Sequence, residues 1–279
     1  MKAIVFGATP SAKTVYMEIE KEYEIVALAD NDPQKWEEGI CGYPVIKPRE
    51  IKEWDWDEII IISTSAMEAI REQLLQMGIS RQRINTRYVD LQVVPRRKWL
   101  EDFALIIHKK SILGAVAEAG VFQGEFASVI NSSFPDRILY LFDTFEGFDQ
   151  RDVMFEEKNG YSDARAGHLS ITSETLVLDK MKYPKNCVIK KGYFPETAAD
   201  INEKFCYVNL DMDLYKPTLE GLRFFYPRMT NGGIITIHDY FSQGYEGVNA
   251  AVKEFLNEVS DDITPFPIGD HVSIAIQKR

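Results

Sequence analysis

The stretch YVNLDMDLYKPTLEGL, residues 207–222, begins as a largely apolar run and then places two aspartates, Asp211 and Asp213, where that run stops. A short run of this kind is typical of a strand that is buried on both faces of a parallel sheet. Parallel sheets belong to α/β folds, in which helices alternate with strands. Ligands of open α/β sheets bind beyond the carboxyl ends of the strands, so residues at these ends are the first candidates for a functional site.

The composition limits the class of protein that this chain can be. It has 279 residues, of which 45% are hydrophobic, and 32 basic against 43 acidic side chains give a formal charge of -11. The charges are scattered and form no basic stripe, which disfavours nucleic acid as a partner. No signal sequence precedes the first strand-like run, and no apolar run approaches the roughly 20 residues that span a bilayer. We therefore expect a globular, cytoplasmic protein that does not bind membranes.

Two kinds of chemistry are disfavoured. The cysteines, Cys41, Cys187 and Cys206, lack the spacing of a disulfide framework or a zinc site, so we expect them to be core thiols. No strained Gly-x-Ser-x-Gly turn is present, which argues against a hydrolase with a Ser-His-Asp triad.

Strand-like and helical segments alternate along the chain, which predicts an α/β fold with two doubly wound domains. In the first 90 residues the strands are KAIVFGA, EIVALAD and DEIIIIST. Residues 93–112 then predict a linker helix that docks on a second domain through apolar side chains at helical spacing, Trp99, Phe103, Ile106 and Ile107. Further strands are expected at residues 115–121, 138–144, 187–193, 205–212, 232–240 and 271–279. We therefore place a Rossmann-like domain at residues 1–92 and the second domain at residues 93–279.

Each domain has a glycine at the end of its first strand and an aspartate at the end of a later strand. The two residues are 23 positions apart in both domains, Gly7 with Asp30 and Gly120 with Asp143. Glycine lets the backbone approach a ligand closely, and the acid can accept hydrogen bonds from ribose hydroxyls, so both pairs suit a nucleoside. In the second domain the turn EAGVFQG, which starts at Glu118, favours adenosine. In the first domain the turn GATPSA lacks the second and third glycines of the dinucleotide fingerprint. That domain is expected to bind a nucleotide or nucleotide-sugar or to be vestigial and purely structural.

Polar residues gather at the carboxyl ends of two strands, with Asp211 and Asp213 at one end and His238 and Asp239 at the next. Carboxylates about 4 Å apart repel by roughly 4 kcal/mol at an effective dielectric near 20, so the cluster needs a cation, a proton or a strong donor. Oxygen ligands with one imidazole suit magnesium or manganese, although a lone aspartate there could simply cap the next helix. Asp211 and Asp213 are two residues apart at this strand end. We assign them different tasks, Asp211 to the metal and Asp213 to acid/base chemistry.

Several motifs after about Pro95 together resemble the macrocin O-methyltransferase family: AEAGVFQGEFA, LYLFDTFEGFD, GYFPETA, LDMDLYKPTLEGLRFFYPRMTNGGIITIHDY and GVNAAVKEF. The resemblance implies a class I methyltransferase fold with a seven-stranded, mostly parallel sheet. It also implies methylation of a sugar or polyol hydroxyl with S-adenosylmethionine. At the position of His238 the family commonly has an aspartate. The softer imidazole is expected to weaken the binding of magnesium, to favour the binding of manganese, or to leave the ion to Asp211, Asp239 and waters.

The resemblance also implies roles for individual residues. The metal ligands are Asp211, His238 and Asp239, and the residues of the chemical step are Asp213 as general base with Asp211 and His238. The residues that bind S-adenosylmethionine are Glu118, Gly120, Val121, Phe122, Gly124, Asp143, Thr144 and Phe145, together with Asp211. The partner is a small-molecule acceptor, namely a sugar, a glycoside or a nucleotide-sugar, and the chain is expected to be able to form a homo-oligomer.

Two other functions stay open from the sequence. One is an NAD- or nucleotide-sugar-dependent enzyme centred on the first domain, and the other is a non-catalytic scaffold that binds a nucleotide or a sugar. The polar insertion EEKNGYSDARAGHLS, which contains His168, is a candidate lid over the substrate, with a solvated loop as the alternative. The turn GYFPET, with Tyr193 and Phe194, either lines the cofactor site or belongs to the core.

Overall fold

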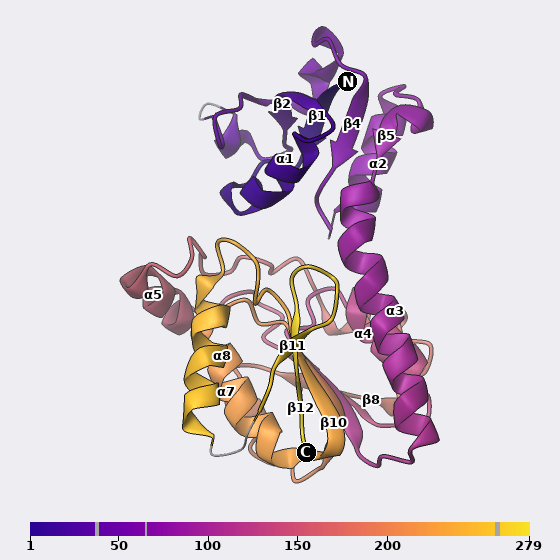
Figure 1. Cartoon of the computed structure of the whole chain (residues 1–279), viewed down its shortest axis with the longest axis vertical. Coiled ribbons are helices and arrows are strands. Elements are labelled where there is room, and N and C mark those ends of the chain that lie inside the picture. Colours follow the sequence, from indigo (N-terminus) through magenta and orange to yellow (C-terminus); the bar gives the residue numbers. More distant parts are fainter. Residues whose placement is uncertain (37–38, 65, 260–262) are drawn as a thin grey trace. The chain divides into compact units, whose positions relative to one another are not determined.

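The computed structural model of the chain describes residues 1–36, 39–64, 66–259 and 263–279. The chain divides into two compact units, Met1–Val94 and Pro95–Arg279. The division falls within a long helix, α3 (Arg87–Lys109), which is drawn in purple to magenta in Figure 1. No helix in the described ranges is both long enough and apolar enough to cross a membrane.

The N-terminal unit is built on a five-stranded parallel sheet with the order β3-β2-β1-β4-β5. Side chains of the central strand, β1, point alternately into two hydrophobic clusters. Ala3 and Val5 belong to one cluster, and Ile4 and Phe6 belong to the other. The sheet is therefore covered on both faces. The strands are β1 (Lys2–Phe6), β2 (Glu24–Ala29), β3 (Val45–Ile46), β4 (Glu58–Ile61) and β5 (Ile84–Asn85), and the helices are α1 (Lys13–Ile19) and α2 (Met67–Gln76).

The C-terminal unit contains a seven-stranded sheet with the order β11-β12-β10-β9-β6-β7-β8. In the described part of the sheet, β12 runs antiparallel to its neighbours β10 and β11, and the other neighbouring strands are parallel. The expected mostly parallel sheet is therefore confirmed. The strand order reverses at β6, which lies between β9 and β7, and such a switch point is where ligands of open α/β sheets bind. The strands are β6 (Ala115–Ala119), β7 (Leu139–Asp143), β8 (Cys187–Lys191), β9 (Phe205–Leu210), β10 (Met229–Ile237), β11 (Phe266–Pro267) and β12 (Ile274–Gln277).

Helices cover both faces of this second sheet. Leu222 of α7 and Phe255 of α8 belong to the hydrophobic cluster on one face, and Ile107 of α3 and Ile130 of α4 belong to the cluster on the other. Figure 1 shows α7 and α8 together on the side of the sheet away from α3 and α4. The further helices are α4 (Glu125–Ser133), α5 (Gln150–Asn159), α6 (Glu174–Asp179), α7 (Tyr215–Phe225) and α8 (Glu246–Glu258). Short 3-10 helices occupy Pro10–Ala12, Pro33–Lys35, Pro48–Glu53, Arg81–Arg83, Pro184–Asn186, Glu196–Ala198 and Tyr226–Arg228.

Two expectations for single side chains are wrong. In α3, Phe103 and Ile107 are buried against the second sheet, but Ile106 is 47% exposed and does not belong to the docking face. The reason is the turn of the helix, which carries Ile106 about 100° around the axis from its buried neighbour. Among the cysteines, Cys206 is buried and Cys187 is half-buried, whereas Cys41 is exposed in a turn with a positive φ.

Candidate functional site

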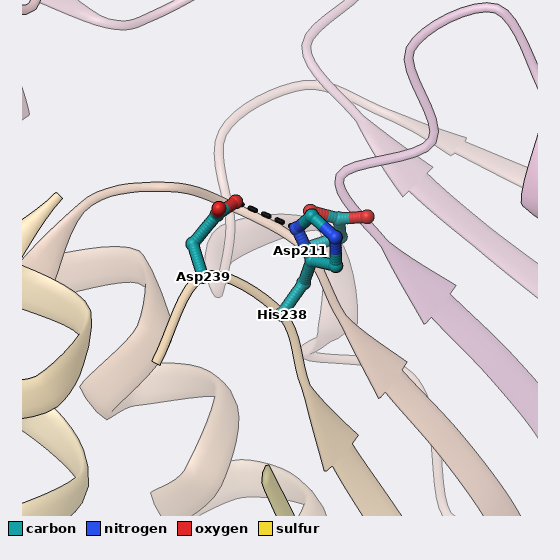
Figure 2. Close-up of side chains that lie close together, drawn as sticks. All are labelled: Asp211, His238 and Asp239. Carbon is teal, nitrogen blue, oxygen red and sulfur yellow. Dashed lines mark hydrogen bonds and ion pairs between the residues drawn. The ribbon is translucent and has the colours of Figure 1, made fainter. Parts of the chain in front are cut away.

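The carboxyl ends of β9 and β10 bring together the residues that the sequence places there. The two strands are parallel neighbours with Leu210 opposite Ile237, and the amide of His238 donates a hydrogen bond to the Leu210 carbonyl over 2.9 Å. The residues that follow, Asp211 on one strand and His238 with Asp239 on the other, therefore lie side by side. Figure 2 shows the imidazole ring of His238 between the two carboxylates.

The imidazole of His238 links both carboxylates through one nitrogen. Its Nδ1 lies 3.1 Å from Oδ1 of Asp211 and 2.6 Å from Oδ2 of Asp239. The outer oxygens are also held, because Arg96 Nη2 donates to Asp211 Oδ2 over 2.8 Å and the Ser242 hydroxyl donates to Asp239 Oδ1. In each carboxylate, one oxygen thus faces Nδ1 of His238, and the other accepts a hydrogen bond from Arg96 or Ser242.

Charge within this group shifts the pKa values of its members. Burial opposes ionisation of Asp211, but the positive charges of His238 and Arg96 outweigh it and hold its pKa well below the usual range. The pKa of Asp239 is also lowered, since His238 outweighs the effect of burial. Burial and Arg96 act to lower the pKa of His238, yet the two carboxylates raise it to about 10. The protonated imidazole therefore supplies positive charge between two ionised aspartates.

Asp213 belongs to the same group of acids. Strand β9 ends at Leu210 and Asp213 has a φ of 62°, so the chain has already turned and the alternation of an extended strand does not apply there. Its pKa is raised well above the usual range by burial and then by the charges of Asp239 and Asp211. Positive φ values at non-glycine residues are costly and concentrate at functional sites, and Asp239 has one as well, at 57°.

The three residues Asp211, His238 and Asp239 fit a hard divalent cation. Each offers one ligand atom, and these atoms lie within 4.8 Å of one another. An octahedral ion with ligands at about 2.1 Å keeps adjacent ligand atoms about 3 Å apart and opposite ones about 4.2 Å apart. The distances from the imidazole nitrogen to the two inward oxygens, 3.1 and 2.6 Å, are close to the adjacent spacing. Two carboxylate oxygens and one imidazole nitrogen form a donor set that suits magnesium or manganese.

The glycines of the first turn are required by the chain's own backbone. Gly120 has a φ of 85°, and a Cβ atom there would lie 1.8 Å from the carbonyl oxygen of Asp211. Gly124 has a φ of 84° at the N-terminal cap of α4, where a Cβ atom would contact Val177. The glycine spacing predicts a ligand at this turn, and close contact between neighbouring chain segments is by itself a sufficient reason for both glycines.

Asp143 holds together the turns that follow β6 and β7. Its Oδ2 accepts hydrogen bonds from the amides of Val121 and Phe122 over 2.8 and 2.9 Å, and its Oδ1 accepts one from the amide of Phe145 over 2.7 Å. Next to it, the Thr144 hydroxyl donates to the carbonyl of Gly147. An ionised carboxylate has about four acceptor positions, so Asp143 keeps capacity for roughly one further donor.

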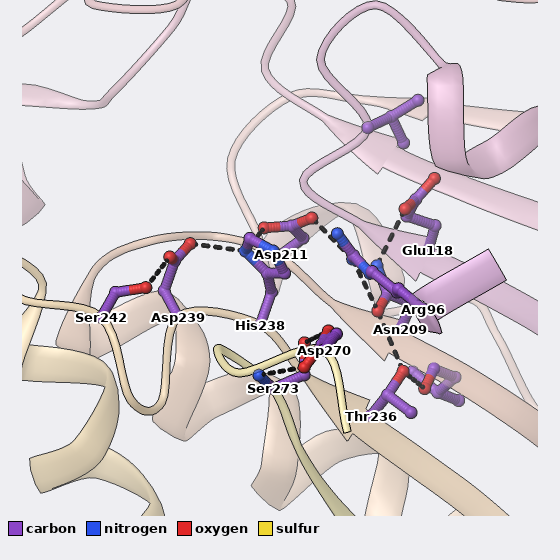
Figure 3. Close-up of polar contacts among 12 residues, drawn as sticks. Arg96, Glu118, Asn209, Asp211, Thr236, His238, Asp239, Ser242, Asp270 and Ser273 are labelled. Carbon is purple, nitrogen blue, oxygen red and sulfur yellow. Dashed lines mark hydrogen bonds and ion pairs between the residues drawn. The ribbon is translucent and has the colours of Figure 1, made fainter. Parts of the chain in front are cut away.

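A buried polar network continues from this site, and it contains Arg96, Asn209 and Thr236, which the sequence did not indicate as site residues (Figure 3). Asn209 donates to Glu118 Oε1 over 2.8 Å and accepts from Arg96 over 3.1 Å and from the Thr236 hydroxyl over 2.9 Å. The other oxygen of Glu118 has no partner in the part of the chain that the structure describes. Burial and the charge of Asp211 raise the pKa of Glu118 well above the usual range. The sequence does contain one indication of this network, because Asn209 is a polar residue within an otherwise largely apolar strand.

The insertion and the third turn have local partners of their own. The backbone of His168 bonds to Phe148, and the His168 ring contacts the Phe148 ring edge-on, so this segment folds back on the loop after β7. Phe194 is buried in the core, and the Tyr193 hydroxyl donates to Asp152 over 2.8 Å.

The glycine turn of the N-terminal unit is occupied by its own side chains. The Tyr16 hydroxyl donates to the carbonyl of Gly7 over 2.9 Å and accepts from the amide of Thr9 over 3.0 Å. Asp30 accepts from the amide of Ala8 and pairs with Lys35, both over 2.9 Å. The backbone groups that would contact a pyrophosphate therefore already have partners, which agrees with the incomplete dinucleotide fingerprint.

Known proteins resemble both parts of the chain. Residues 92–269 match the family model of macrocin-O-methyltransferase (TylF), and residues 1–85 match the model described as C2185-like, N-terminal. The chain is 27% identical over 170 residues to mycinamicin III 3''-O-methyltransferase of Micromonospora griseorubida, an alignment that covers 56% of this chain and 66% of that enzyme.

Solved structures with low sequence identity share the fold. The O-methyltransferase NovP superposes with a TM-score of 0.58 at 16% identity, over 77% of this chain and 99% of that one. The calicheamicin methyltransferase CalS11 superposes with a TM-score of 0.53 at 19% identity, over 77% of this chain and 90% of that one.

Proposed function

The chain belongs to the macrocin O-methyltransferase family, and from this premise we propose that it transfers a methyl group from S-adenosylmethionine to a hydroxyl of a sugar or polyol, assisted by magnesium or manganese. The observation that carries the proposal is the convergence of Asp211, His238 and Asp239 at the ends of two neighbouring strands. The sulfonium of the cofactor supplies an activated methyl group. The residues of the chain have to bind and orient the two reactants and accept one proton.

Binding of the cofactor is assigned to the turns after β6 and β7. Asp143 has capacity for a ribose hydroxyl, and Glu118 offers a buried oxygen without a partner among the described residues. The backbone around Gly120 and Gly124, with Val121, Phe122, Thr144 and Phe145, forms the walls of this proposed site. The position of these turns at the strand-order reversal supports the assignment, since α/β sheets bind their ligands there.

Proton removal is assigned to the acids beyond β9 and β10. Asp211, His238 and Asp239 would hold the divalent cation, which supplies positive charge that stabilises a developing alkoxide and lowers the pKa of nearby acids. Asp213 is the proposed general base, because it lies in the same acidic group, where a bound cation would lower its otherwise raised pKa and leave it ionised to accept the proton. Vicinal hydroxyls of a sugar, a glycoside or a nucleotide-sugar suit such a cation.

The N-terminal unit is proposed to bind the nucleotide or glycan part of the acceptor. Its open parallel sheet supports a role in ligand binding, since α/β sheets bind ligands beyond the carboxyl ends of their strands. An NAD-dependent enzyme centred on this unit is less well supported, because Tyr16 already bonds the turn where the pyrophosphate would lie.

A methyl-transfer assay tests the proposal. The full chain is incubated with S-adenosylmethionine labelled on its methyl group and with a panel of nucleotide-sugars and glycosides, each with magnesium, manganese or a chelator. We expect label in at least one sugar, at a rate that falls by about 100-fold or more in Asp213→Asn, the typical size of a general-base contribution. Transfer that is unchanged in this variant would remove Asp213 from the mechanism, and label in no acceptor would speak against the reaction itself.

A further inference from the structure

The turn that carries Asp213 is strained and needs support from its surroundings. The amide of Leu214 donates to the carbonyl of Met212 over 2.7 Å, and Asp213 between them has a φ of 62°. A hydrogen bond that closes around one residue with a positive φ forms a γ-turn of the rare, strained kind, which persists only where neighbouring groups fix it. On the strand side, the amide of Asp211 donates to the carbonyl of Ala119 on β6 over 2.8 Å. The helix side of the turn needs a support of its own.

Glu156 of α5 supplies this second support. The residue is 1% exposed, and its Oε1 accepts a hydrogen bond from the amide of Tyr215 over 2.8 Å. Tyr215 is the first residue of α7, and Leu214 before it makes no side-chain cap bond. An acid 59 positions away in the sequence thus takes the place of a local N-terminal cap. The ring of Tyr215 is held as well, because it stacks on Phe155 and on Tyr161, with ring centres 4.9 and 5.5 Å away.

The carboxylate of Glu156 also borders α8, the helix that follows His238 and Asp239. A Cβ atom added at Gly247, the second residue of α8, would lie 2.8 and 2.9 Å from its two oxygens. Its Oε2 accepts a hydrogen bond from the Ser162 hydroxyl over 2.9 Å. No cation pairs with it among the described residues, and burying such an acid costs free energy. A buried acid that stability alone does not explain, at the start of both helices behind the site, points to a functional task.

The backbone connects Glu156 to the proposed base. Tyr215 follows Asp213 by two residues, so the bond to its amide fixes the end of the strained turn and with it the direction of the Asp213 carboxylate. Misplacing a reacting group by about 1 Å can cost about 100-fold in rate. Resting on the proposed function, we propose that Glu156 is a positioning residue, which holds the Asp213 turn in the orientation that proton removal from the acceptor hydroxyl requires. Because it acts by accepting a hydrogen bond from the Tyr215 amide, the position of its oxygen matters and its charge does not.

Two substitutions that separate length from charge test this role. Glu156→Gln removes the charge but keeps the length and an oxygen that can accept from the Tyr215 amide, and its NH2 group can donate to the Ser162 hydroxyl. Glu156→Asp keeps the charge but withdraws the oxygen by one methylene. Methyl transfer by the full chain is measured at saturating S-adenosylmethionine, with the nucleotide-sugar or glycoside of the panel that the wild type methylates fastest.

The two variants should differ in turnover and agree in binding. We expect kcat to fall by about 10-fold to 100-fold in Glu156→Asp and to stay within about threefold of the wild type in Glu156→Gln. KM for the acceptor and the calorimetric Kd for S-adenosylhomocysteine should change by less than about twofold in both, because a misdirected base affects the chemical step and not the binding of the reactants.

Asp152→Ala is the matched control for a general loss of packing. Asp152 is also a buried acid of α5, but it accepts a hydrogen bond from the Tyr193 hydroxyl over 2.8 Å, away from the turn of Asp213. Its kcat should stay at the wild-type level even where urea denaturation shows a loss of stability as large as that of Glu156→Asp. If Glu156→Asp does not fold, Glu156→Met, which has a similar size and no acceptor for the amide, takes its place with the same expected fall in kcat.

The outcomes separate the inference from the proposed function. An equal fall of kcat in both Glu156 variants, a wild-type kcat in Glu156→Asp, or an equal fall in Asp152→Ala overturns the positioning role while the methyltransferase proposal stands. A wild-type chain that methylates no member of the panel contradicts the proposed function itself, and the inference falls with it.

Discussion

Arg96 and Asp211 are 115 residues apart in the sequence, and a hydrogen-bonded ion pair of 2.8 Å joins Nη2 of the first to Oδ2 of the second. The contact ties helix α3 to the end of β9, so the helix that opens the C-terminal unit also holds a residue of the candidate site. With Arg96 on one oxygen and His238 on the other, Asp211 is balanced by positive charge on both sides.

Removing Arg96 should destabilise the protein by leaving part of that charge unbalanced. We expect Arg96→Met to lower the free energy of unfolding by about 1–3 kcal/mol, less than the 3–5 kcal/mol typical of a fully buried pair. Urea denaturation of the single variants and of Arg96→Met with Asp211→Asn measures this. The double variant should lose less than the sum of the single losses, and strict additivity would mean that the pair contributes nothing.

Gly120 should not tolerate a side chain. Because its Cβ would lie 1.8 Å from the Asp211 carbonyl oxygen and its φ is 85°, Gly120→Ala should lower the free energy of unfolding by more than about 3 kcal/mol. The matched control is Gly160→Ala, where φ is 65° but no atom lies within 4 Å of the new Cβ. That variant should lose only about 1–2 kcal/mol, the conformational cost alone. Equal losses in urea denaturation would show that the close contact has no energetic effect.

The stability of the metal-free protein should fall as the pH rises. The pKa of His238 is about 10 in the folded state, against about 6.5 for an unperturbed histidine, because Asp211 and Asp239 outweigh the opposing effects of burial and Arg96. A raised pKa stabilises the fold fully below pH 6.5, and this contribution disappears as the pH rises toward 10. Urea denaturation between pH 6 and 10 with a chelator should show the decline, and His238→Gln should reduce it. An equally steep decline in the variant would assign the effect to other groups.

Replacing His238 by an aspartate should change which ion the site prefers. A third carboxylate is a harder ligand than imidazole and adds negative charge, so His238→Asp should bind magnesium more tightly and prefer manganese less strongly. Calorimetric titration of both ions into the wild type and the variant measures the ratio of the two affinities. The exposed Asp163, replaced by asparagine, serves as a control that should change neither value. A ratio that does not move would mean that residue 238 does not contact the ion.

The parts of the site that follow from strand order could be predicted from the sequence, and those that depend on packing could not. Asp211, His238 and Asp239 lie together because parallel neighbours end at the same edge of the sheet, which apolar runs and their end residues are enough to indicate. Nothing in the basic run around Arg96 separates that arginine from Arg97, since only the way α3 packs on the sheet turns one inward. Likewise, the need for a glycine at position 120 depends on the position of the Asp211 carbonyl, which the sequence does not reveal.

The expectations that failed concern single side chains rather than elements. Ile106 fits an apolar helical pattern as well as Ile107 does, but the helix presents only one of them to the sheet. Residue type predicts a core position for Cys41, whereas its turn places it at the surface. Residue type and spacing predict the existence of an element better than the direction of one side chain within it.

Calorimetric titration of S-adenosylhomocysteine shows whether the turns after β6 and β7 bind S-adenosylmethionine. The titration is made into metal-stripped protein and repeated with magnesium and with manganese, with Asp143→Ala as the comparison. We expect micromolar binding to the wild type, weakened at least about tenfold when the carboxylate that orders both turns is removed. An absence of binding under all three conditions would mean that these turns do not form a cofactor site.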